Sequence, residues 1–497
     1  MNKSQKYFIY KMKDSKILFF LFTLFALLNL SFCGRHSKDE WKSRVVYQVV
    51  TDRFAKTDDD SLTDCDISKN TYCGGTFKGI QENLDYIKGM GFTGLWISPP
   101  LKNKENSFHG YHNIDLYSVN EHFGTSDDLK NLIEECHKKD IWVILDAVPN
   151  HMAGELDIST FKPFNKTEHY HEACDVDEYS TQEERENCRI YGMPDLNHEN
   201  SYVNETLLNW LDETLNKYDF DGIRYADVEN VPKWFWSNFS KVANEYTFGI
   251  ISTDNDDVEY VAEYQKYMDG VGDYPFFYTI RNSFSGSMRN LSDYYKNIRP
   301  KYTNPKYNTI FFGNHDDSRF LNECNHKNAL RNALIFTLFY EGIPIIYYGD
   351  EQYFSGARDP ECREAMYGKL DTSSDAYKLI KKALDIRNYE KVYDQDLNEV
   401  YADDNLYSYS RGNKILVVVT NTDKTIEKDF TEHQFKEGTK LCNELKDDDC
   451  VIVKDGKIPV KMEGEPKVFI PDDDDFRRFT KSSWISISII LLLNLFF

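Results

Sequence analysis

The chain has 497 residues, a length that fits one large domain with smaller satellites. Aspartate and glutamate number 82 against 59 lysines and arginines, which gives a formal net charge of -23. This balance argues against nucleic-acid binding, because contacts to the phosphate backbone require basic residues.

A basic stretch at the N-terminus leads into an apolar run over residues 17–33, ILFFLFTLFALLNLSFC. This order is typical of a secretory signal peptide, so we assign residues 1–33 to a signal peptide or signal anchor. The alternative stays open, because an uncleaved run with its basic flank inside would be a type II membrane anchor.

Short apolar runs alternate with helical stretches about eight times between residues 41 and 390. This repeat predicts an α/β fold, a (β/α)8 TIM barrel of parallel strands. Residues 151–197 are too long for an ordinary loop and are expected to form an inserted subdomain. Residues 391–471 contain only strand-like runs, which predict a C-terminal antiparallel β-sandwich domain.

The chain ends on an apolar tail, SSWISISIILLLNLFF, after the polar segment DDDDFRRFTKSS. A polar spacer followed by a terminal apolar tail is typical of a glycosylphosphatidylinositol-anchor signal, which we place at residues 472–497.

Ten cysteines and several Asn-x-Ser/Thr sequons, among them those at Asn165, Asn204, Asn238 and Asn290, indicate an oxidising, glycosylating compartment and therefore a secreted glycoprotein. Three short-loop cysteine pairs are expected to form disulfides: Cys65 with Cys73, Cys174 with Cys188, and Cys442 with Cys450. A weaker prediction pairs Cys324 with Cys362. Cys136 lies in a helical stretch and is expected to be a packed free thiol.

In a parallel barrel the functional residues lie where strands end. Four strand ends carry acids, His, Asn or Arg: DAVPNH, DGIRYADVENV, GIISTDND and FFGNHDDSRF. Any one of them alone would be a helix cap, but four together indicate a site.

The chain resembles the secreted α-amylases of glycoside hydrolase family 13, especially the fungal type. The similarity covers residues 44–471 and is carried by long motifs in the same order: TDRFAKTD, GYHNIDLYSVNEHFGTSDDL, DAVPNHM, YMDGVGDYPFFY, NHDDSRF and GIPIIYYGDEQYFSGARDPECREA.

Enzymes of this family cleave with retention, using a nucleophilic carboxylate and an acid/base held roughly 5 Å apart. The resemblance places the third family aspartate at Asp316 and the family arginine at Arg224. The nucleophile position holds Ala226, and alignment on the following segment puts the acid/base position at Ser252. Neither residue can attack or protonate a sugar, so the resemblance implies an inactive member of the family.

Asp227 lies next to the nucleophile position, but alternation along a strand points it elsewhere, and we expect it to cap the following helix. Glu263 is expected to be a surface charge. The family's calcium ligands correspond to Asn150, Asn197 and Asn230, and replacing a carboxylate by an amide predicts a weak or lost calcium site.

Six positions match sugar-contacting residues of the family. By resemblance they are Tyr111, His151, Arg224, His315, Asp359 and Arg363. His112 replaces a stacking residue that is commonly Trp, and Glu229 with Asn230 replaces a Lys-His pair, so part of the groove differs.

The leading hypothesis is an α-amylase-like protein of carbohydrate metabolism that is secreted, anchored at the cell surface and catalytically inactive. It would either retain weak binding of α-glucan or maltooligosaccharide or serve as an interaction module. One alternative is an active endo-acting α-1,4-glucan hydrolase that uses Asp227 with Asp254 or Glu263. Another is a type II membrane heavy chain that is linked through Cys33 to a transporter subunit.

Overall fold

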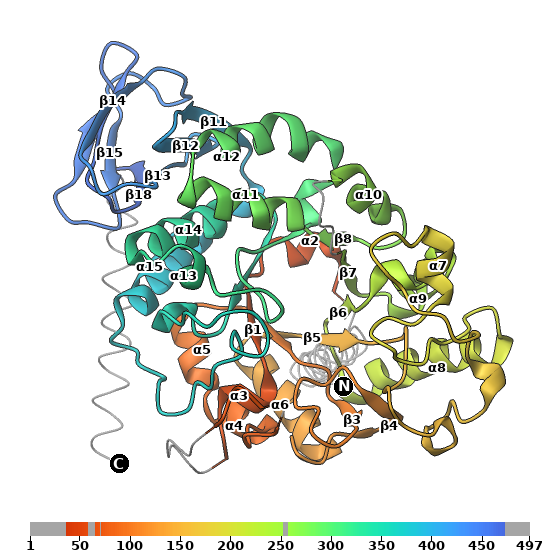
Figure 1. Ribbon diagram of the computed structural model, residues 1–497. Helices are drawn as coiled ribbons and strands as arrows, with labels where there is room; N and C mark the ends of the chain where they lie inside the picture. The colour runs from red at the N-terminus through yellow and green to blue at the C-terminus, as the bar shows by residue number, and fades with distance from the viewer. Residues whose placement is uncertain (1–35, 58–64, 70, 252–256, 473–497) are drawn as a thin grey trace, which may run out of the picture.

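The computed structural model describes residues 36–57, 65–69, 71–251 and 257–472 (Figure 1). Eight parallel strands close into a barrel in the order β1-β10-β9-β8-β7-β6-β5-β2, which confirms the predicted fold class. The strands are β1 (Val46–Val49), β2 (Gly94–Ile97), β5 (Trp142–Ala147), β6 (Gly222–Tyr225), β7 (Tyr246–Ile250), β8 (Gly270–Gly272), β9 (Thr309–Ile310) and β10 (Ile343–Tyr347).

Helices follow the barrel strands and pack around them (Figure 1). The longer ones are α4 (Phe77–Glu82), α5 (Leu84–Met90), α6 (Ser126–Lys138), α8 (Ser201–Tyr218), α9 (Lys233–Ala243), α10 (Val258–Glu263), α11 (Tyr274–Ser285), α14 (Lys327–Phe339) and α15 (Asp375–Tyr389). Short helices are α2 (Lys38–Trp41), α3 (Thr51–Phe54), α12 (Arg289–Asp293) and α13 (Phe320–Glu323).

Trp41 lies fully buried in the apolar cluster of the barrel interior and packs on Trp142 and Tyr246. Its Nε1 donates a hydrogen bond to the carbonyl oxygen of Asp221 at 3.0 Å. Strand β6 starts with Gly222, where a Cβ atom would lie 2.8 Å from the Trp41 ring. The absence of a side chain at Gly222 therefore lets the indole pack directly on the strand.

Two insertions lie on the side of the barrel where the strands end. The first is the hairpin β3 (Leu101–Asn103) and β4 (Asn113–Val119) between β2 and α6. The second separates β5 from α8 and contains α7 (Gln182–Asn187) and the disulfide Cys174–Cys188. The predicted insertion, residues 151–197, falls between β5 and α8.

The C-terminal domain places a six-stranded antiparallel sheet against a two-stranded one, with an apolar core of its own. The large sheet has the order β11-β12-β13-β18-β15-β16, and β14 pairs with β17. The strands are β11 (Leu397–Ala402), β12 (Leu406–Arg411), β13 (Ile415–Thr420), β14 (Ile426–Phe430), β15 (Lys440–Asn443), β16 (Cys450–Ile452), β17 (Ile458–Met462) and β18 (Lys467–Pro471).

The three short-loop disulfides are present as predicted, and Cys136 is a buried free thiol. The predicted pairing of Cys324 with Cys362 is wrong, because both thiols are free. Cys362 Sγ donates to the carbonyl of His315 at 3.1 Å, whereas Cys324 Sγ donates to Phe284, in α11, at 3.8 Å. Each thiol is thus held by a different part of the fold.

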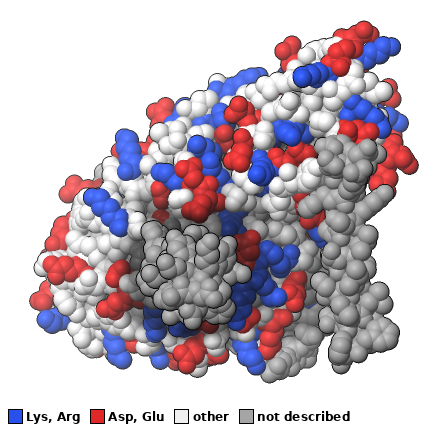
Figure 2. Space-filling view, turned by 180° about the vertical axis from the view of Figure 1, so that it is seen from behind, with Lys and Arg blue, Asp and Glu red and all other residues white. Residues whose placement is uncertain are grey.

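Within the described residues, no helix combines the length and the apolar character needed to cross a membrane. Both predicted terminal signals lie almost wholly outside that part of the chain. Figure 2 shows acidic and basic side chains interspersed over one face of the molecule.

Candidate functional site

The nucleophile position lies at the end of β6, where Ala226 is buried with an exposed fraction of 1%. Its backbone N–H donates to the Ala147 carbonyl at 2.9 Å, which continues the ladder between β5 and β6. Strand β6 pairs with β7 in register, Arg224 beside Phe248 and Tyr225 beside Gly249. The next step of this register places Ala226 level with Ile250.

Ile250 packs against the apolar cluster inside the barrel, whereas Ile251 belongs to the outer core. The described strand therefore presents Ile250 to the barrel mouth beside Ala226. The sequence-predicted acid/base position, Ser252, lies outside the described residues. Ile250 and Ser252 both lack a carboxyl group.

Asp316 follows β9 and is an accessible acid of the site, with its side chain 53% exposed. Its Oδ1 accepts from Arg363 NH2 at 3.2 Å, and its Oδ2 lies 3.5 Å from His315 Nε2. Partial burial opposes ionisation, but the neighbouring His315 and the guanidinium groups of Arg363 and Arg224 lower the Asp316 pKa. This carboxylate is an ionised acceptor at neutral pH.

Arg363 forms ion pairs with two acids, Asp316 and Asp359. Its NH1 lies 3.1 Å from Asp359 Oδ1, and its Nε donates to the His315 carbonyl at 2.7 Å. The guanidinium is buried, whereas the Asp359 side chain is 46% exposed. The predicted pair Asp359 and Arg363 is therefore an ion pair that presents its carboxylate to solvent.

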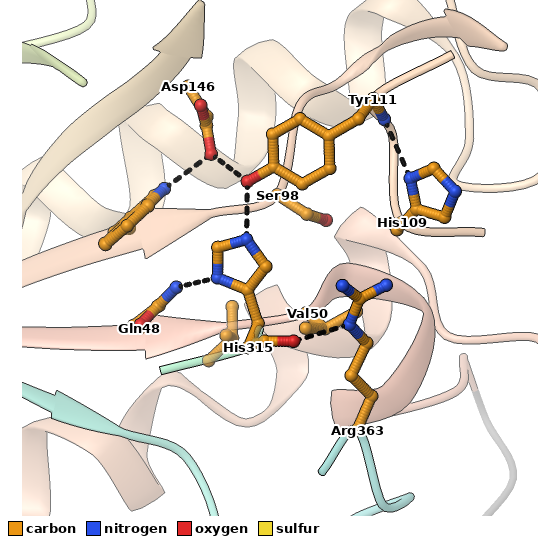
Figure 3. A pocket seen from close by; sticks show the side chains of 10 residues that line it. Gln48, Val50, Ser98, His109, Tyr111, Asp146, His315 and Arg363 are labelled. Carbon is orange, nitrogen blue, oxygen red and sulfur yellow. Dashed lines mark hydrogen bonds between the residues drawn. The ribbon is translucent and has the colours of Figure 1, made fainter. Parts of the chain in front are cut away.

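A chain of hydrogen bonds joins residues that line a pocket (Figure 3). Gln48 Nε2 lies 2.7 Å from His315 Nδ1, His315 Nε2 lies 2.9 Å from the Tyr111 hydroxyl, and Tyr111 donates to Asp146 Oδ2 at 2.7 Å. Asp146 also accepts from Arg224 NH1 at 2.8 Å.

Burial lowers the pKa of His315 to about 4, so its imidazole is neutral. The amide N–H of Gln48 then requires Nδ1 as its acceptor, and the proton lies on Nε2, which donates to Tyr111. Desolvation, reinforced by the charge of Asp146, raises the pKa of Tyr111 well above its usual value. Tyr111 consequently remains a neutral donor to Asp146.

His151 lies in the wall of the mouth and has an exposed fraction of 1%. Its Nδ1 is 3.3 Å from the Met152 carbonyl, and its Nε2 is 3.1 Å from Asp227 Oδ2. The expected helix-capping role of Asp227 is wrong, since the residue adopts the left-handed conformation and makes no side-chain cap hydrogen bond. Its carboxylate turns to His151 instead.

Glu263 is a surface charge, as predicted, and pairs with Lys233 at 2.7 Å. His112, the replacement for a stacking aromatic residue, is held by Ser107, whose Oγ lies 2.7 Å from its Nδ1. Neither side chain contributes an acid to the mouth.

The candidate calcium ligands lie behind His151. The terminal amide atom of Asn150 is 2.8 Å from the Asn230 carbonyl and 3.0 Å from Asp195 Oδ1. With the amide oxygen turned inward, three oxygens converge, which is the donor type that Ca²⁺ prefers. With the amide nitrogen turned inward, two hydrogen bonds close the same cluster without a cation.

Asn197 lies outside this cluster, contrary to the prediction from sequence. Its Oδ1 accepts from the backbone N–H groups of Glu199 and Asn200 at 3.0 and 3.1 Å, so it shapes the turn into α8. The carboxylate in the cluster is Asp195, two residues earlier. The predicted loss of ligand charge therefore does not apply, and the residues present fit a calcium ion.

Three residues of this region, Asp195, Gln48 and Ile250, were not predicted from the sequence. The motif PDLN contains two residues that could be the ligand, and only the fold distinguishes them. Gln48 and Ile250 lie within apolar runs, where no local signal sets them apart from core residues.

Comparison with known proteins identifies the family of this chain. Residues 48–427 match the family model described as alpha amylase, catalytic domain. The chain is 33% identical over 461 residues to an α-amylase of Saccharomycopsis fibuligera, covering 87% of this chain and 92% of that protein. The chain therefore belongs to the α-amylase family of glycoside hydrolases.

Solved structures agree with this assignment. An α-amylase from Malbranchea cinnamomea superposes with a TM-score of 0.83 at 32% identity, covering 88% of this chain and 97% of that one. An α-amylase of Geobacillus thermoleovorans, solved with acarbose, gives 0.79 at 30% identity, covering 87% and 99%.

Proposed function

We propose that this α-amylase-family protein binds α-glucans or maltooligosaccharides without hydrolysing them. The observation that carries the proposal is the pair Ala226 and Ile250, which stand where two strands end at the mouth and offer no carboxylate. Retaining hydrolysis needs both a nucleophile and an acid/base, and the two groups act as a unit. Asp316 alone cannot supply either step.

The groups that remain favour a neutral, hydroxyl-rich ligand. The exposed carboxylates Asp316 and Asp359 accept hydrogen bonds but repel anions, and the basic groups Arg224 and Arg363 are buried behind them. Binding of acarbose by the Geobacillus relative supports a ligand of the same chemical class here.

The test uses the purified ectodomain with starch and with maltoheptaose. We expect no release of reducing ends, together with measurable binding of maltoheptaose by calorimetry. Hydrolysis that persists after repurification would overturn the inactive assignment, and absence of binding would overturn the glucan ligand.

A second candidate, an active hydrolase with a relocated acid, is favoured by the orientation of Asp227 toward the mouth. It needs a further carboxylate besides Asp227 and Asp316, and the ion pair of Glu263 with Lys233 speaks against Glu263. Asp254, the other proposed partner, lies outside the described residues. Any activity that Asp227→Asn abolishes would favour this candidate.

For location, we propose the extracellular surface with a lipid anchor. The terminal apolar segments and the extracellular character of the predicted disulfides support this. Release of the protein from cells by a phosphatidylinositol-specific phospholipase tests the anchor. N-terminal sequencing of the mature protein distinguishes a cleaved signal from the type II, transporter-associated alternative.

A further inference from the structure

At the barrel mouth beside His151, the exposed side chain is Asp227 and not His151, which the family resemblance predicts as the sugar contact. The His151 ring is buried, and both of its nitrogens face acceptors, the Met152 carbonyl and Asp227. The Asp227 side chain is 24% exposed. A ligand entering this corner therefore meets the carboxylate before it meets the imidazole.

The backbone explains why Asp227 points this way. At φ 50° and ψ 43°, the residue leaves the extended conformation of β6 directly after Ala226. Aspartate is among the few residues that adopt this left-handed region readily. The turn interrupts the alternation of the strand, so a side chain expected to face the helix layer lies at the mouth.

The surroundings hold this carboxylate in place. Oδ2 is bonded to His151 Nε2 at 3.1 Å, and across the described residues the side chain makes no second hydrogen bond. Burial lowers the pKa of Arg224, but nearby negative charge raises it overall. Asp146 has the larger effect, and Asp227 lies close enough to add to it. Asp227 thus has a fixed position and an oxygen available to accept.

We propose that Asp227 is a ligand-binding residue that accepts hydrogen bonds from the hydroxyl groups of a bound α-glucan, with His151 as its positioning residue. This inference rests on the proposed function and names the group that carries it. A carboxylate oxygen is an acceptor only, and it forms the stronger charge-assisted hydrogen bonds with hydroxyl donors. Asp227 would thereby take over a contact that the resemblance assigned to His151.

The experiment measures maltoheptaose binding by calorimetry with the purified protein. Asp227→Ala should weaken binding about tenfold, the size of one charge-assisted hydrogen bond, and Asp227→Asn should weaken it by a smaller factor. Glu263→Gln removes a surface carboxylate that is paired with Lys233 and should leave affinity unchanged. Thermal unfolding checks that each variant is folded.

The possible results distinguish a failure of the role of Asp227 from a failure of the proposed α-glucan binding. If the unaltered protein binds maltoheptaose and Asp227→Ala binds it equally or more tightly, the role of Asp227 is overturned. The glucan ligand then still stands. No binding by the unaltered protein overturns the proposed function, and this inference with it. A loss in Asp227→Ala that equals the loss in Glu263→Gln also contradicts the proposal, since it would report general charge.

Discussion

Ala226 and Ile250 stand level with each other on adjacent barrel strands, one at the end of β6 and one at the end of β7. Ile250 packs against the apolar cluster inside the barrel, and Ala226 is buried next to it in the register. Two hydrocarbon side chains therefore line a corner that needs two carboxylates for retaining hydrolysis. The family's barrel scaffold is thus present around a corner where the two described side chains carry no carboxyl group.

This register gives a sharp reversion test. Ala226→Asp combined with Ile250→Glu should recover partial hydrolysis of starch, because it restores two acids at one level of the barrel. Ala226→Asp combined with Ser252→Glu is the pair that sequence alignment predicts. Activity in the Ser252 pair alone would contradict the assignment of Ile250, and each single reversion should stay inactive because both groups are required.

The barrel, the C-terminal sheets and three disulfides could be predicted because their signals are local: apolar periodicity, turn residues and short cysteine loops. The retained residues Tyr111, Arg224 and His315 were also identified from motifs. Asp227 could not be, since strand alternation fails where one residue adopts a left-handed conformation. The choice between Asp195 and Asn197 depends on a contact with Asn150 that only the folded chain makes.

The oxygen cluster of Asn150, Asp195 and Asn230 predicts a response to calcium. We expect Ca²⁺ to raise the unfolding temperature by several degrees over a chelator-treated sample, since a ligand at 100 times its Kd stabilises by about 2.7 kcal/mol. Differential scanning fluorimetry measures the shift, with Mg²⁺ as the comparison ion.

Two variants locate that effect. Asp195→Asn should remove the calcium shift, whereas Asn197→Asp should leave it unchanged, because Asn197 shapes a turn outside the cluster. Equal unfolding temperatures with and without Ca²⁺ in the unaltered protein would mean that the Asn150 amide nitrogen faces inward.

Tyr111→Phe breaks the chain from Gln48 to Asp146 at its centre. The change leaves the His315 Nε2–H without its acceptor at 2.9 Å and removes one donor from the buried Asp146. A buried group left unsatisfied costs about 1–3 kcal/mol, and we expect a loss of that size in the free energy of unfolding. Urea denaturation measures it. A neutral effect would show that water replaces the hydroxyl.

Gly222→Ala tests the packing at the floor of the barrel. The added methyl group would lie 2.8 Å from the Trp41 ring, which is itself fixed by its hydrogen bond to Asp221. Overpacking of this kind costs about 1–3 kcal/mol. The same substitution at Gly438, where the added carbon meets nothing within 4 Å but φ is 79°, separates backbone strain from steric overlap.

The ion pair of His137 and Asp221 gives a pH dependence of stability. His137 Nε2 lies 2.9 Å from Asp221 Oδ2, and this hydrogen bond raises the His137 pKa above its ordinary value of 6.5. Although burial opposes it, hydrogen bonding from His137 and His36 lowers the pKa of Asp221.

The stabilisation from His137 is thus complete below pH 6.5 and is lost as the pH rises through the raised value. His137→Gln should destabilise the protein by about 1 kcal/mol at pH 5.5 and by progressively less toward pH 9, measured by urea denaturation at each pH. His326→Gln is the comparison. Its pair with Asp423 is solvent-exposed on both sides and contributes little, so its penalty, which includes the lost acceptor for the Ala329 N–H at the start of α14, should vary little with pH. A His137 penalty that stays constant from pH 5.5 to pH 9 would show that the side chain acts by packing rather than by charge.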